Sequence, residues 1–209
     1  MKKILLVSLV FMFIFAATSV YAAEKFVLGN TNVALKVDYF AFTEDVFGDI
    51  DLDEGAYVGL EGYYGVMPDL YVGLEVGWAG TSNDGDVNIA GEMVDTDVDV
   101  TLVPVELNLK YVIEASPEWI IGLGAGFSYN YFEVEIDPKD YGSADEDDWV
   151  WGGQLFAEVN YKMSDQWFLG INGKYQFTEK LEFDIMGEDV ETDTRADNWR
   201  AGVQIGMMF

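Results

Sequence analysis

Hydrophobic and polar residues alternate along most of the chain from residue 30 onward. Between residues 103 and 111 the odd positions are all apolar or aromatic, whereas Pro104, Glu106, Asn108 and Lys110 occupy the even ones. A period of two is that of a β-strand, because successive strand side chains point to opposite faces. The pattern predicts eight strands with no helix between them. Their spans are 33–40, 58–66, 70–78, 103–111, 121–130, 154–163, 169–177 and 199–209.

The connections between the predicted strands alternate in length. Three of them are short and contain turn-forming residues such as Pro, Asp and Ser, at residues 67–69, 114–117 and 164–166. The other four are long and acidic, near residues 44–55, 80–98, 133–149 and 178–197. Short turns at one end of a barrel and long loops at the other are typical of bacterial outer-membrane barrels.

Strand length and apolar stripes separate two kinds of barrel. Each predicted strand has about ten residues, enough to cross a bilayer when tilted, and Tyr and Trp lie near strand ends as in aromatic girdles. In a soluble up-and-down barrel such as a lipocalin, the apolar face would point inward and a glycine-rich face would meet water. The sequence favours an all-β fold: an eight-stranded antiparallel up-and-down transmembrane β-barrel with short periplasmic turns and long acidic extracellular loops. The barrel must be closed, because lipid satisfies no open sheet edge.

The start of the chain is predicted to be a cleaved signal peptide. Two lysines are followed by an apolar run at residues 4–17, and Val20 and Ala22 precede the expected cleavage site. The apolar run is too short to span a bilayer as a helix. We therefore expect a signal peptide at residues 1–22 and one outer-membrane β-barrel domain at residues 23–209.

Composition narrows the possible functions. The chain of 209 residues has 38 acidic residues against 11 Lys and Arg, a net charge of −27, with 12 Tyr, 14 Phe and 6 Trp, but neither Cys nor His. So many aromatic residues argue for a folded chain despite the charge. Disulfides, thiolate or imidazole metal sites and Ser-His triads are excluded. The acidic balance disfavours nucleic acid as a partner, and no cofactor is expected.

Charged residues of both signs occupy the inward-facing positions of the predicted strands. The acids are Asp38, Glu61, Glu75, Glu106 and Glu158, and the bases are Lys36, Lys110, Lys162, Lys174 and Arg200. A selective pore would carry an excess of one sign. Equal numbers inside an eight-stranded barrel, whose interior side chains can fill, instead suggest a salt-bridged plug.

Spacing around one turn predicts where this plug is centred. Glu61 and Glu75 are equidistant from Pro68, so they should be neighbours across the hairpin, and two close carboxylates require cations beside them. We expect Lys36, Lys110 and Arg200 to supply those cations. The network either gates a narrow pore or consists of interior polar groups that only satisfy one another.

Two adjacent predicted strands resemble a known family. The runs VPVELNLKY at 103–111 and GLGAGFSY at 122–129 are similar to the small outer-membrane barrels that include OmpA, OmpX and OmpW. Phe209, at the end of an aromatic stripe, is similar to the signal that this family presents to the barrel-assembly machinery. The resemblance implies a location in the outer membrane of a Gram-negative-type bacterium, and the expected network resembles the lumenal ion-pair gate of the OmpA barrel.

The acidic loops suggest partners. Asp145, Asp147 and Asp148 are candidate ligands for a divalent cation, although a solvated, repelling loop is the favoured interpretation. Loop carboxylates could also bridge through divalent cations to the phosphates of lipopolysaccharide, and outer-membrane lipid is the expected partner of a monomeric barrel.

Three classes of function remain for such a barrel. The leading one is a non-enzymatic barrel with a structural or surface-interaction role. The alternative is a narrow channel, or an OmpW-like conduit for small hydrophobic molecules lined by Phe40, Phe42 and Phe156. An enzyme is not expected, because lipid-modifying barrels and omptin-type proteases use a histidine that this chain lacks. The paired carboxylates Glu61 and Glu75 are predicted inside a plug, where no substrate fits.

Overall fold

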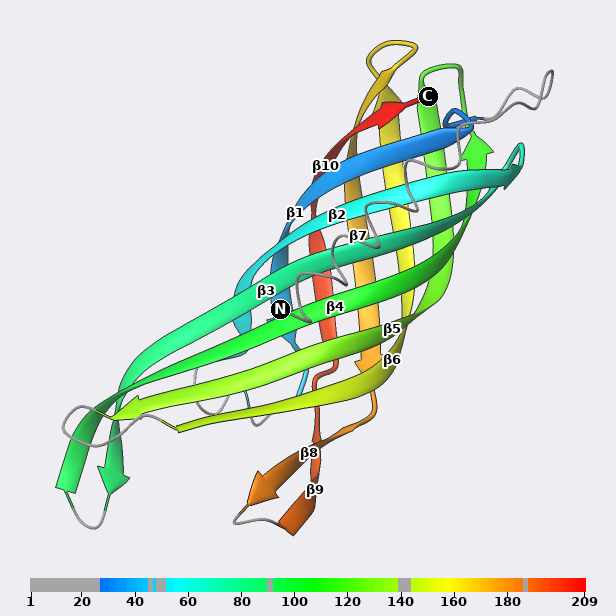
Figure 1. Cartoon of the computed structure of the whole chain (residues 1–209). Coiled ribbons are helices and arrows are strands. Elements are labelled where there is room, and N and C mark those ends of the chain that lie inside the picture. Colours follow the sequence, from blue (N-terminus) through cyan, green and yellow to red (C-terminus); the bar gives the residue numbers. More distant parts are fainter. Residues whose placement is uncertain (1–26, 45–46, 48–51, 90–91, 139–143, 186–187) are drawn as a thin grey trace, which may run out of the picture.

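The computed structural model describes residues 27–44, 47, 52–89, 92–138, 144–185 and 188–209. Nearly all of these residues lie in strands (Figure 1). The strands are β1 (Thr31–Phe42), β2 (Glu54–Met67), β3 (Leu70–Ile89), β4 (Glu92–Glu114), β5 (Trp119–Pro138), β6 (Ala144–Lys162), β7 (Trp167–Thr178), β8 (Lys180–Ile185), β9 (Glu188–Arg195) and β10 (Asn198–Met208). Within the described ranges no helix is long and apolar enough to cross a membrane.

Eight of the strands form a closed antiparallel barrel. Their order around the barrel is β1–β10–β7–β6–β5–β4–β3–β2, and each strand pairs with its neighbours. The barrel closes between its first and last strands, where Asn32 pairs with Met208 and Phe42 with Asn198. Strands β8 and β9 form a separate hairpin between β7 and β10. The predicted eight-stranded up-and-down barrel is therefore confirmed.

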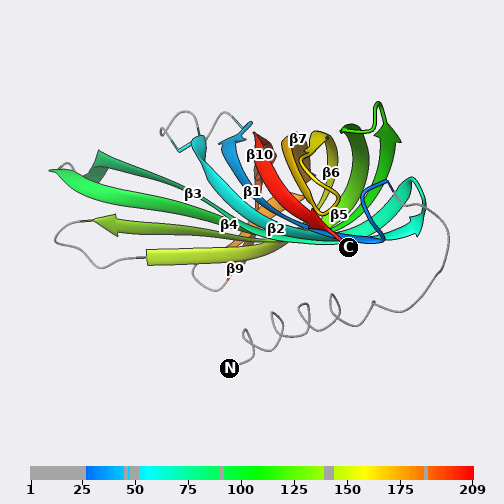
Figure 2. The same cartoon turned by 90° about the horizontal axis from the view of Figure 1, so that it is seen from above.

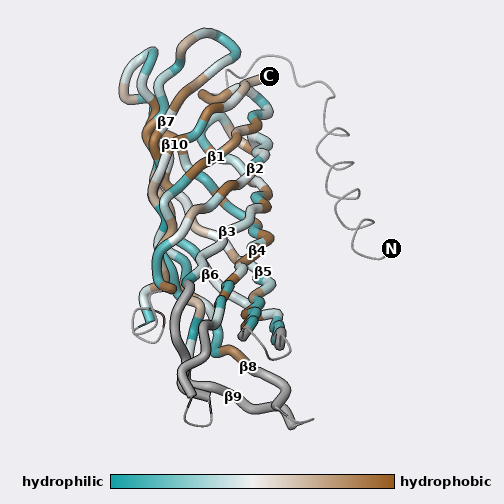
Figure 3. Tube along the Cα trace, turned by 90° about the vertical axis from the view of Figure 1, so that its left-hand side faces the viewer, coloured by the Kyte–Doolittle hydropathy of each residue, from teal (hydrophilic) through white to brown (hydrophobic). Residues whose placement is uncertain are grey.

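The apolar face of each strand points outward. On β1, Leu35 and Val37 are 48% and 51% exposed, whereas Lys36 and Asp38 between them are 1% and 4% exposed. Outward leucine, phenylalanine and isoleucine on other strands are as exposed, and the hydropathy of the chain alternates along each strand (Figure 3). A lipocalin has the opposite arrangement. The exterior is therefore the lipid-facing surface of a membrane barrel.

The two ends of the barrel differ. Short connections at residues 68–69, 115–118 and 163–166, together with Val27 and Phe209, lie at one end, the turn end, at the top of Figure 1. At the opposite loop end, β3 to β6 reach past the other barrel strands on one side (Figures 1 and 2).

These extensions correct the prediction of long loops at residues 80–98 and 133–149. The segments are largely strand, with Ser82 opposite Asp99 and Glu133 opposite Asp147. The period of two does not stop there: inward Val98 and Val100 alternate with Asp97 and Asp99. Only the outward residue type changes, from apolar to acidic. The loss of outward apolar residues therefore marks the end of the lipid-facing surface and not the end of the strand. The predicted loop at 178–197 likewise contains the β8–β9 hairpin.

Two apolar clusters fill the barrel, one at each end. The loop-end cluster consists of Phe40, Phe42, Phe47, Leu52, Tyr57, Ala79, Val100, Leu102, Phe132, Val150, Leu181 and Ala196. The turn-end cluster consists of Val27, Leu28, Ala34, Tyr63, Tyr71, Val112, Ile120, Phe156, Phe168 and Met208. Between Leu102 of the first cluster and Val112 of the second, the inward positions of β4 include Glu106 and Lys110. The polar layer of the lumen is thus enclosed between two apolar layers.

Candidate functional site: an ion-pair network in the lumen

Strand register brings three carboxylates side by side in the lumen. Glu61 on β2 lies opposite Glu75 on β3, and Glu75 lies opposite Glu106 on β4. All three are at most 1% exposed. Directly opposed like charges destabilise a sheet. Three adjacent carboxylates in this setting therefore require cations from the rest of the barrel wall.

Two lysines lie between these carboxylates. Lys36 Nζ on β1 is 2.7 Å from Glu61 Oε2 and 3.1 Å from Glu75 Oε2. Lys174 Nζ on β7 is 2.7 Å from the same Glu75 oxygen and also contacts Glu106 Oε2. Each lysine therefore bridges two neighbouring acids, and Glu75 is bound from two strands across the lumen.

The contacts continue at both ends of this group. Arg200 Nη2 on β10 lies 2.5 Å from Glu106 Oε1. At the other end, Lys110 Nζ lies 3.5 Å from Glu61 Oε1 and 3.0 Å from Glu158 Oε1. The contacts form one unbranched series of alternating sign, which we call the ion-pair network. In order, its members are Arg200, Glu106, Lys174, Glu75, Lys36, Glu61, Lys110 and Glu158.

Aromatic rings support the cations. Lys110 Nζ lies 3.7 Å from the ring centroid of Tyr63, and Arg200 Cζ lies 4.2 Å from that of Tyr57, both within the range of cation–π attraction. The Tyr57 hydroxyl also donates a hydrogen bond of 2.7 Å to Glu75 Oε1. Added Cβ atoms at Gly59 and Gly77 would lie 2.5 and 2.2 Å from that hydroxyl oxygen. The glycines therefore make room for Tyr57, a signal that could have identified this ring from the sequence.

Amide side chains continue the polar layer on both sides. Asn108 donates to Glu106 Oε2 at 3.1 Å and accepts from Gln154 at 2.7 Å. Asn160 and Gln204 donate to the two oxygens of Glu158 at 2.9 and 3.2 Å. These carboxylates thus accept hydrogen bonds from amides in addition to forming ion pairs, because buried charges must be both paired and hydrogen-bonded.

The predicted lumenal residues divide into three groups. Glu61, Glu75, Lys36 and Lys110 meet at the expected place. Arg200 binds Glu106 instead of Glu61 or Glu75. Glu106, Lys174 and Glu158, which were among the ten predicted lumenal charges but not in the predicted centre of five, are links of the network. Barrel shear displaces strands along the axis, which turn counting does not capture.

Asp38 and Lys162 are the two remaining predicted lumenal charges. Asp38 is buried and accepts a hydrogen bond of 2.9 Å from Asn172 Nδ2. Lys162 is partly exposed at the turn end of β6, directly before the connection to β7.

The candidate cation ligands lie at the loop end of β6. Asp147 is exposed, Asp148 is partly buried, and the side chain of Asp145 lies outside the described residues. In the described part of the chain, no three carboxylates come close enough to one another to hold a metal ion. The predicted assembly signal, Phe209, is 63% exposed at the turn end.

Comparison with known proteins identifies the family. A match to the family described as outer membrane protein beta-barrel domain covers residues 7–207. The chain belongs to this family. As an outer membrane β-barrel it is a transmembrane protein of the Gram-negative outer membrane, as predicted. No curated protein matches it in sequence.

Solved structures of small outer membrane β-barrels share its fold. The chain is similar to OprG from Pseudomonas aeruginosa, with a TM-score of 0.58 and 15% identity over 88% of this chain and 98% of that one. It is similar to Neisserial surface protein A, with a TM-score of 0.57 and 12% identity over 87% and 98%. It is also similar to Ail of Yersinia pestis in complex with the heparin analogue sucrose octasulfate, with a TM-score of 0.52 and 10% identity over 84% and 97%.

Proposed function

We propose that this protein is a closed, non-enzymatic barrel that serves the outer membrane as a structural element and as a surface for contacts. The observation that carries the proposal is the arrangement of the lumen, where the ion-pair network is enclosed between the two apolar clusters. A pore needs a continuous water path, and the two clusters of buried apolar side chains, at different depths in the lumen, support a closed barrel.

The loop-end cluster is a compact group of aromatic rings. The ring centroid of Phe42 lies 4.2 Å from that of Phe47, in a stacked arrangement, and 4.7 Å from that of Phe40 in an edge-on one. The ring centroid of Phe132 lies 6.0 Å from those of both Phe42 and Phe47. Of the residues considered as the lining of a conduit, Phe40 and Phe42 are therefore packed on each other at this end, whereas Phe156 belongs to the turn-end cluster. Their packing favours filling of the lumen over passage of hydrophobic molecules.

The contacts of the acids support the non-enzymatic proposal. A general acid or base must reach a proton on a substrate. Glu61 and Glu75, the pair considered for such work, are each bound by two cations and are at most 1% exposed. Their ionised oxygens are committed to the barrel wall, so the pair is suited to holding strands together.

The surface role rests on the outer face of β3 to β6. On this face, residues that lie opposite one another on neighbouring strands form rows, and the residue type changes from one row to the next toward the loop end. Trp78, Tyr131 and Trp149 occupy the first row, with the Tyr131 and Trp149 centroids 5.3 Å apart. Such an aromatic belt marks the membrane interface. Next toward the loop end comes a row with Gly80, Thr101, Glu133 and Asp147, and then one with Ser82, Asp99 and Glu135.

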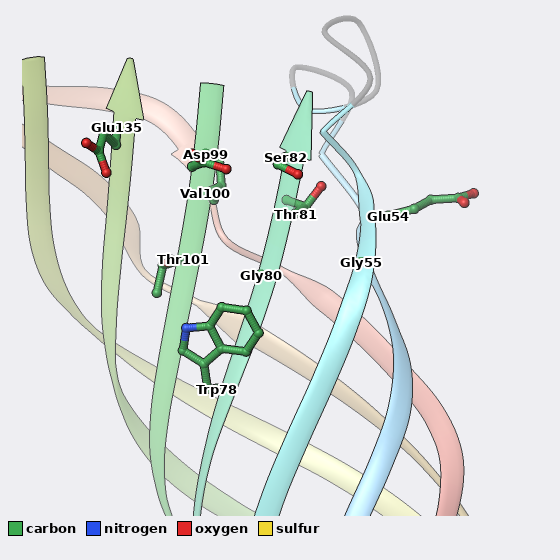
Figure 4. Close-up of a pocket in the computed structure, with 10 residues that line it drawn as sticks. All are labelled: Glu54, Gly55, Trp78, Gly80, Thr81, Ser82, Asp99, Val100, Thr101 and Glu135. Carbon is green, nitrogen blue, oxygen red and sulfur yellow. The ribbon is translucent and has the colours of Figure 1, made fainter. Parts of the chain in front are cut away.

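A pocket of about 540 Å³ lies across these rows, and its lining residues are drawn in Figure 4. Gly80 makes room for the Trp78 indole, which borders the pocket on the membrane side, and Asp99 and Glu135 lie on the loop side. The pocket therefore joins an apolar wall to a pair of carboxylates at the level where lipid headgroups begin.

We propose that divalent cations connect this face to lipopolysaccharide phosphates. Directly opposed acidic pairs lie on it, among them Asp97 with Asp137, Asp99 with Glu135, and Glu133 with Asp147. Such pairs repel unless a cation lies between them. Lipid phosphates at the same level carry the same sign, so Mg²⁺ or Ca²⁺ would stabilise both. In this proposal the barrel is a monomer, and Phe209 is the residue that the assembly machinery recognises.

Two experiments test the two parts of this proposal. Proteoliposomes should swell in small sugars and amino acids no faster than empty liposomes, whereas faster swelling would favour the channel alternative. Binding of lipopolysaccharide to the purified barrel should weaken in EDTA and in the Asp99→Asn, Glu135→Gln double variant. The Glu114→Gln variant, at an exposed acid on the turn end of β4, is the matched control. Binding that is indifferent to EDTA and to the double variant would contradict the surface role.

A further inference from the structure

A short segment before the first strand crosses the turn-end mouth of the barrel. Residues Val27 to Asn30, which we call the strap, precede β1 and lie at that end. Leu28 is fully buried and Val27 is 7% exposed. Both belong to the turn-end cluster, whose other members come from the inward faces of β1 to β7 and β10. The strap therefore packs inside the mouth and not on the outer wall.

Two buried side chains bind the backbone of the strap, Tyr71 on β3 and Asn32 on β1, whose Nδ2 donates to the Leu28 carbonyl at 3.3 Å. The Leu28 N–H donates a hydrogen bond of 2.9 Å to the hydroxyl oxygen of Tyr71, and that hydroxyl donates to the Gly29 carbonyl at 3.1 Å. Tyr71 itself is fully buried. Beside it, the Val27 N–H donates to the Pro68 carbonyl at 3.3 Å. The β2–β3 turn thus holds the strap through its polar groups.

A glycine turns the strap from the barrel wall into the mouth. Gly29 has a φ of +69°, in the left-handed region that side chains disfavour. A Cβ at this position would lie 2.7 Å from the carbonyl oxygen and 2.9 Å from the nitrogen of Phe209. The Asn30 N–H donates to the same Phe209 oxygen at 2.8 Å. The turn therefore fits closely against the last residue of the chain, at the seam where β1 meets β10.

We propose that the strap is a tethered lid over the turn-end mouth, with Tyr71 as its latch and Gly29 as its turning point. When Tyr71 releases the strap, the mouth opens to Tyr63 and Val112 of the same cluster and then to Lys110 beneath the Tyr63 ring. The loop-end cluster stays closed, so the opening gives access from one side without making a pore. This lid is independent of the proposed function and remains testable if the barrel proves to conduct.

The absence of native cysteine permits a direct accessibility test. Val112→Cys places a reporter in the turn-end cluster, and Val100→Cys places a matched reporter in the loop-end cluster. The two valines are 1% and 2% exposed, respectively. The full chain, refolded in detergent, is labelled with a large polar maleimide in the presence and absence of Tyr71→Phe. That variant removes only the latching hydroxyl, and Tyr64→Phe, on the outward face of β2, is its control.

We expect Tyr71→Phe to speed labelling of the Val112→Cys reporter about tenfold, the factor that corresponds to about 1.4 kcal/mol of hydrogen bonding. Labelling of the Val100→Cys reporter should not change, and neither reporter should respond to Tyr64→Phe. Equal labelling of the Val112→Cys reporter with and without Tyr71→Phe would overturn the lid. So would equal acceleration at both reporters, because that result means general loosening.

A second variant tests the lid without changing Tyr71. Gly29→Ala disturbs the turn through the Phe209 backbone, with Met208 Cβ 3.1 Å from the added methyl, and keeps the Tyr71 hydroxyl. It should raise labelling of the Val112→Cys reporter and leave the Val100→Cys reporter unaffected. If neither Tyr71→Phe nor Gly29→Ala yields the compact, heat-modifiable form on a gel, the strap is a requirement for folding and the lid is refuted.

Discussion

Glu61 and Glu75 lie directly opposite each other on paired strands, and the ammonium group of Lys36 binds both carboxylates, at 2.7 and 3.1 Å. This triad joins three adjacent strands, β1, β2 and β3, through their inward side chains. Lys174 and Arg200 extend the connection across the lumen to Glu106. The network therefore connects β1, β7 and β10 to β3 and β4 through ion pairs in the polar layer between the two apolar clusters.

Removal of one central acid should destabilise the barrel strongly. Glu75→Gln leaves Lys36 and Lys174 with half of their partners, and a buried charge without its partner costs about 3 kcal/mol or more. Urea unfolding of the refolded barrel in detergent measures the loss of free energy. Glu114→Gln, at an exposed acid, should change stability by no more than about 0.5 kcal/mol. Equal stability of the two variants would mean that the network contributes little.

Residues at the end of the network should be energetically coupled. Lys110 and Glu158 lie 3.0 Å apart, so Lys110→Met removes the cation that pairs with Glu158, and Glu158→Gln leaves Lys110 with Glu61 alone. The double variant should therefore be more stable than the sum of the single effects predicts, by about 1 kcal/mol or more. A double-mutant cycle from urea unfolding gives this coupling. Additive effects would show that the pair acts through other neighbours.

Two glycines in the barrel wall should respond oppositely to alanine. A Cβ at Gly77 would lie 2.2 Å from the Tyr57 hydroxyl oxygen, so Gly77→Ala should displace that ring from Glu75 and cost about 1–3 kcal/mol. At Gly173 the nearest contact is a carbonyl oxygen 3.9 Å away, so Gly173→Ala should be neutral or slightly stabilising. Thermal unfolding followed by band shift on a gel compares them. Equal melting of both variants would argue that Tyr57 has room to move.

The sequence predicted the wall of the barrel better than its interior. Alternation determined which residues point inward, because a strand gives each side chain one of two faces. It therefore placed all eight members of the ion-pair network on inward faces, where they are buried. It could not give heights across the lumen, which depend on barrel shear, and so it placed Arg200 with the wrong acids. Contacts across the lumen join strands far apart in order, and no local pattern reports them.

Other features were missed for different physical reasons. Tyr57 and Tyr63 look like ordinary alternating aromatic residues, and their role against Arg200 and Lys110 depends on facing strands. The strap precedes the first alternating segment and has no periodicity of its own. The sequence predicts loops at the extensions of β4 and β5 because the outward residues there become acidic, although the strands continue.

The aromatic group at the loop end should be the outer seal of the lumen. Phe42→Ala removes a ring that contacts Phe40, Phe47 and Phe132, and truncation of a buried phenylalanine costs about 3–5 kcal/mol. If the barrel remains folded, the variant should still fail to conduct, because the turn-end cluster and the ion-pair network stay in place. Conduction by this variant alone would show that the loop-end cluster is the sole barrier.

The most direct test of a closed lumen is single-channel recording of the refolded barrel in a planar bilayer, with insertion verified independently. We expect no discrete openings from the unmodified protein, and none from Lys110→Ala at salt concentrations where larger porins conduct. Cation-selective openings from the unmodified protein, altered in size or lifetime by Lys110→Ala, would contradict the closed lumen. That result would make the ion-pair network a gate.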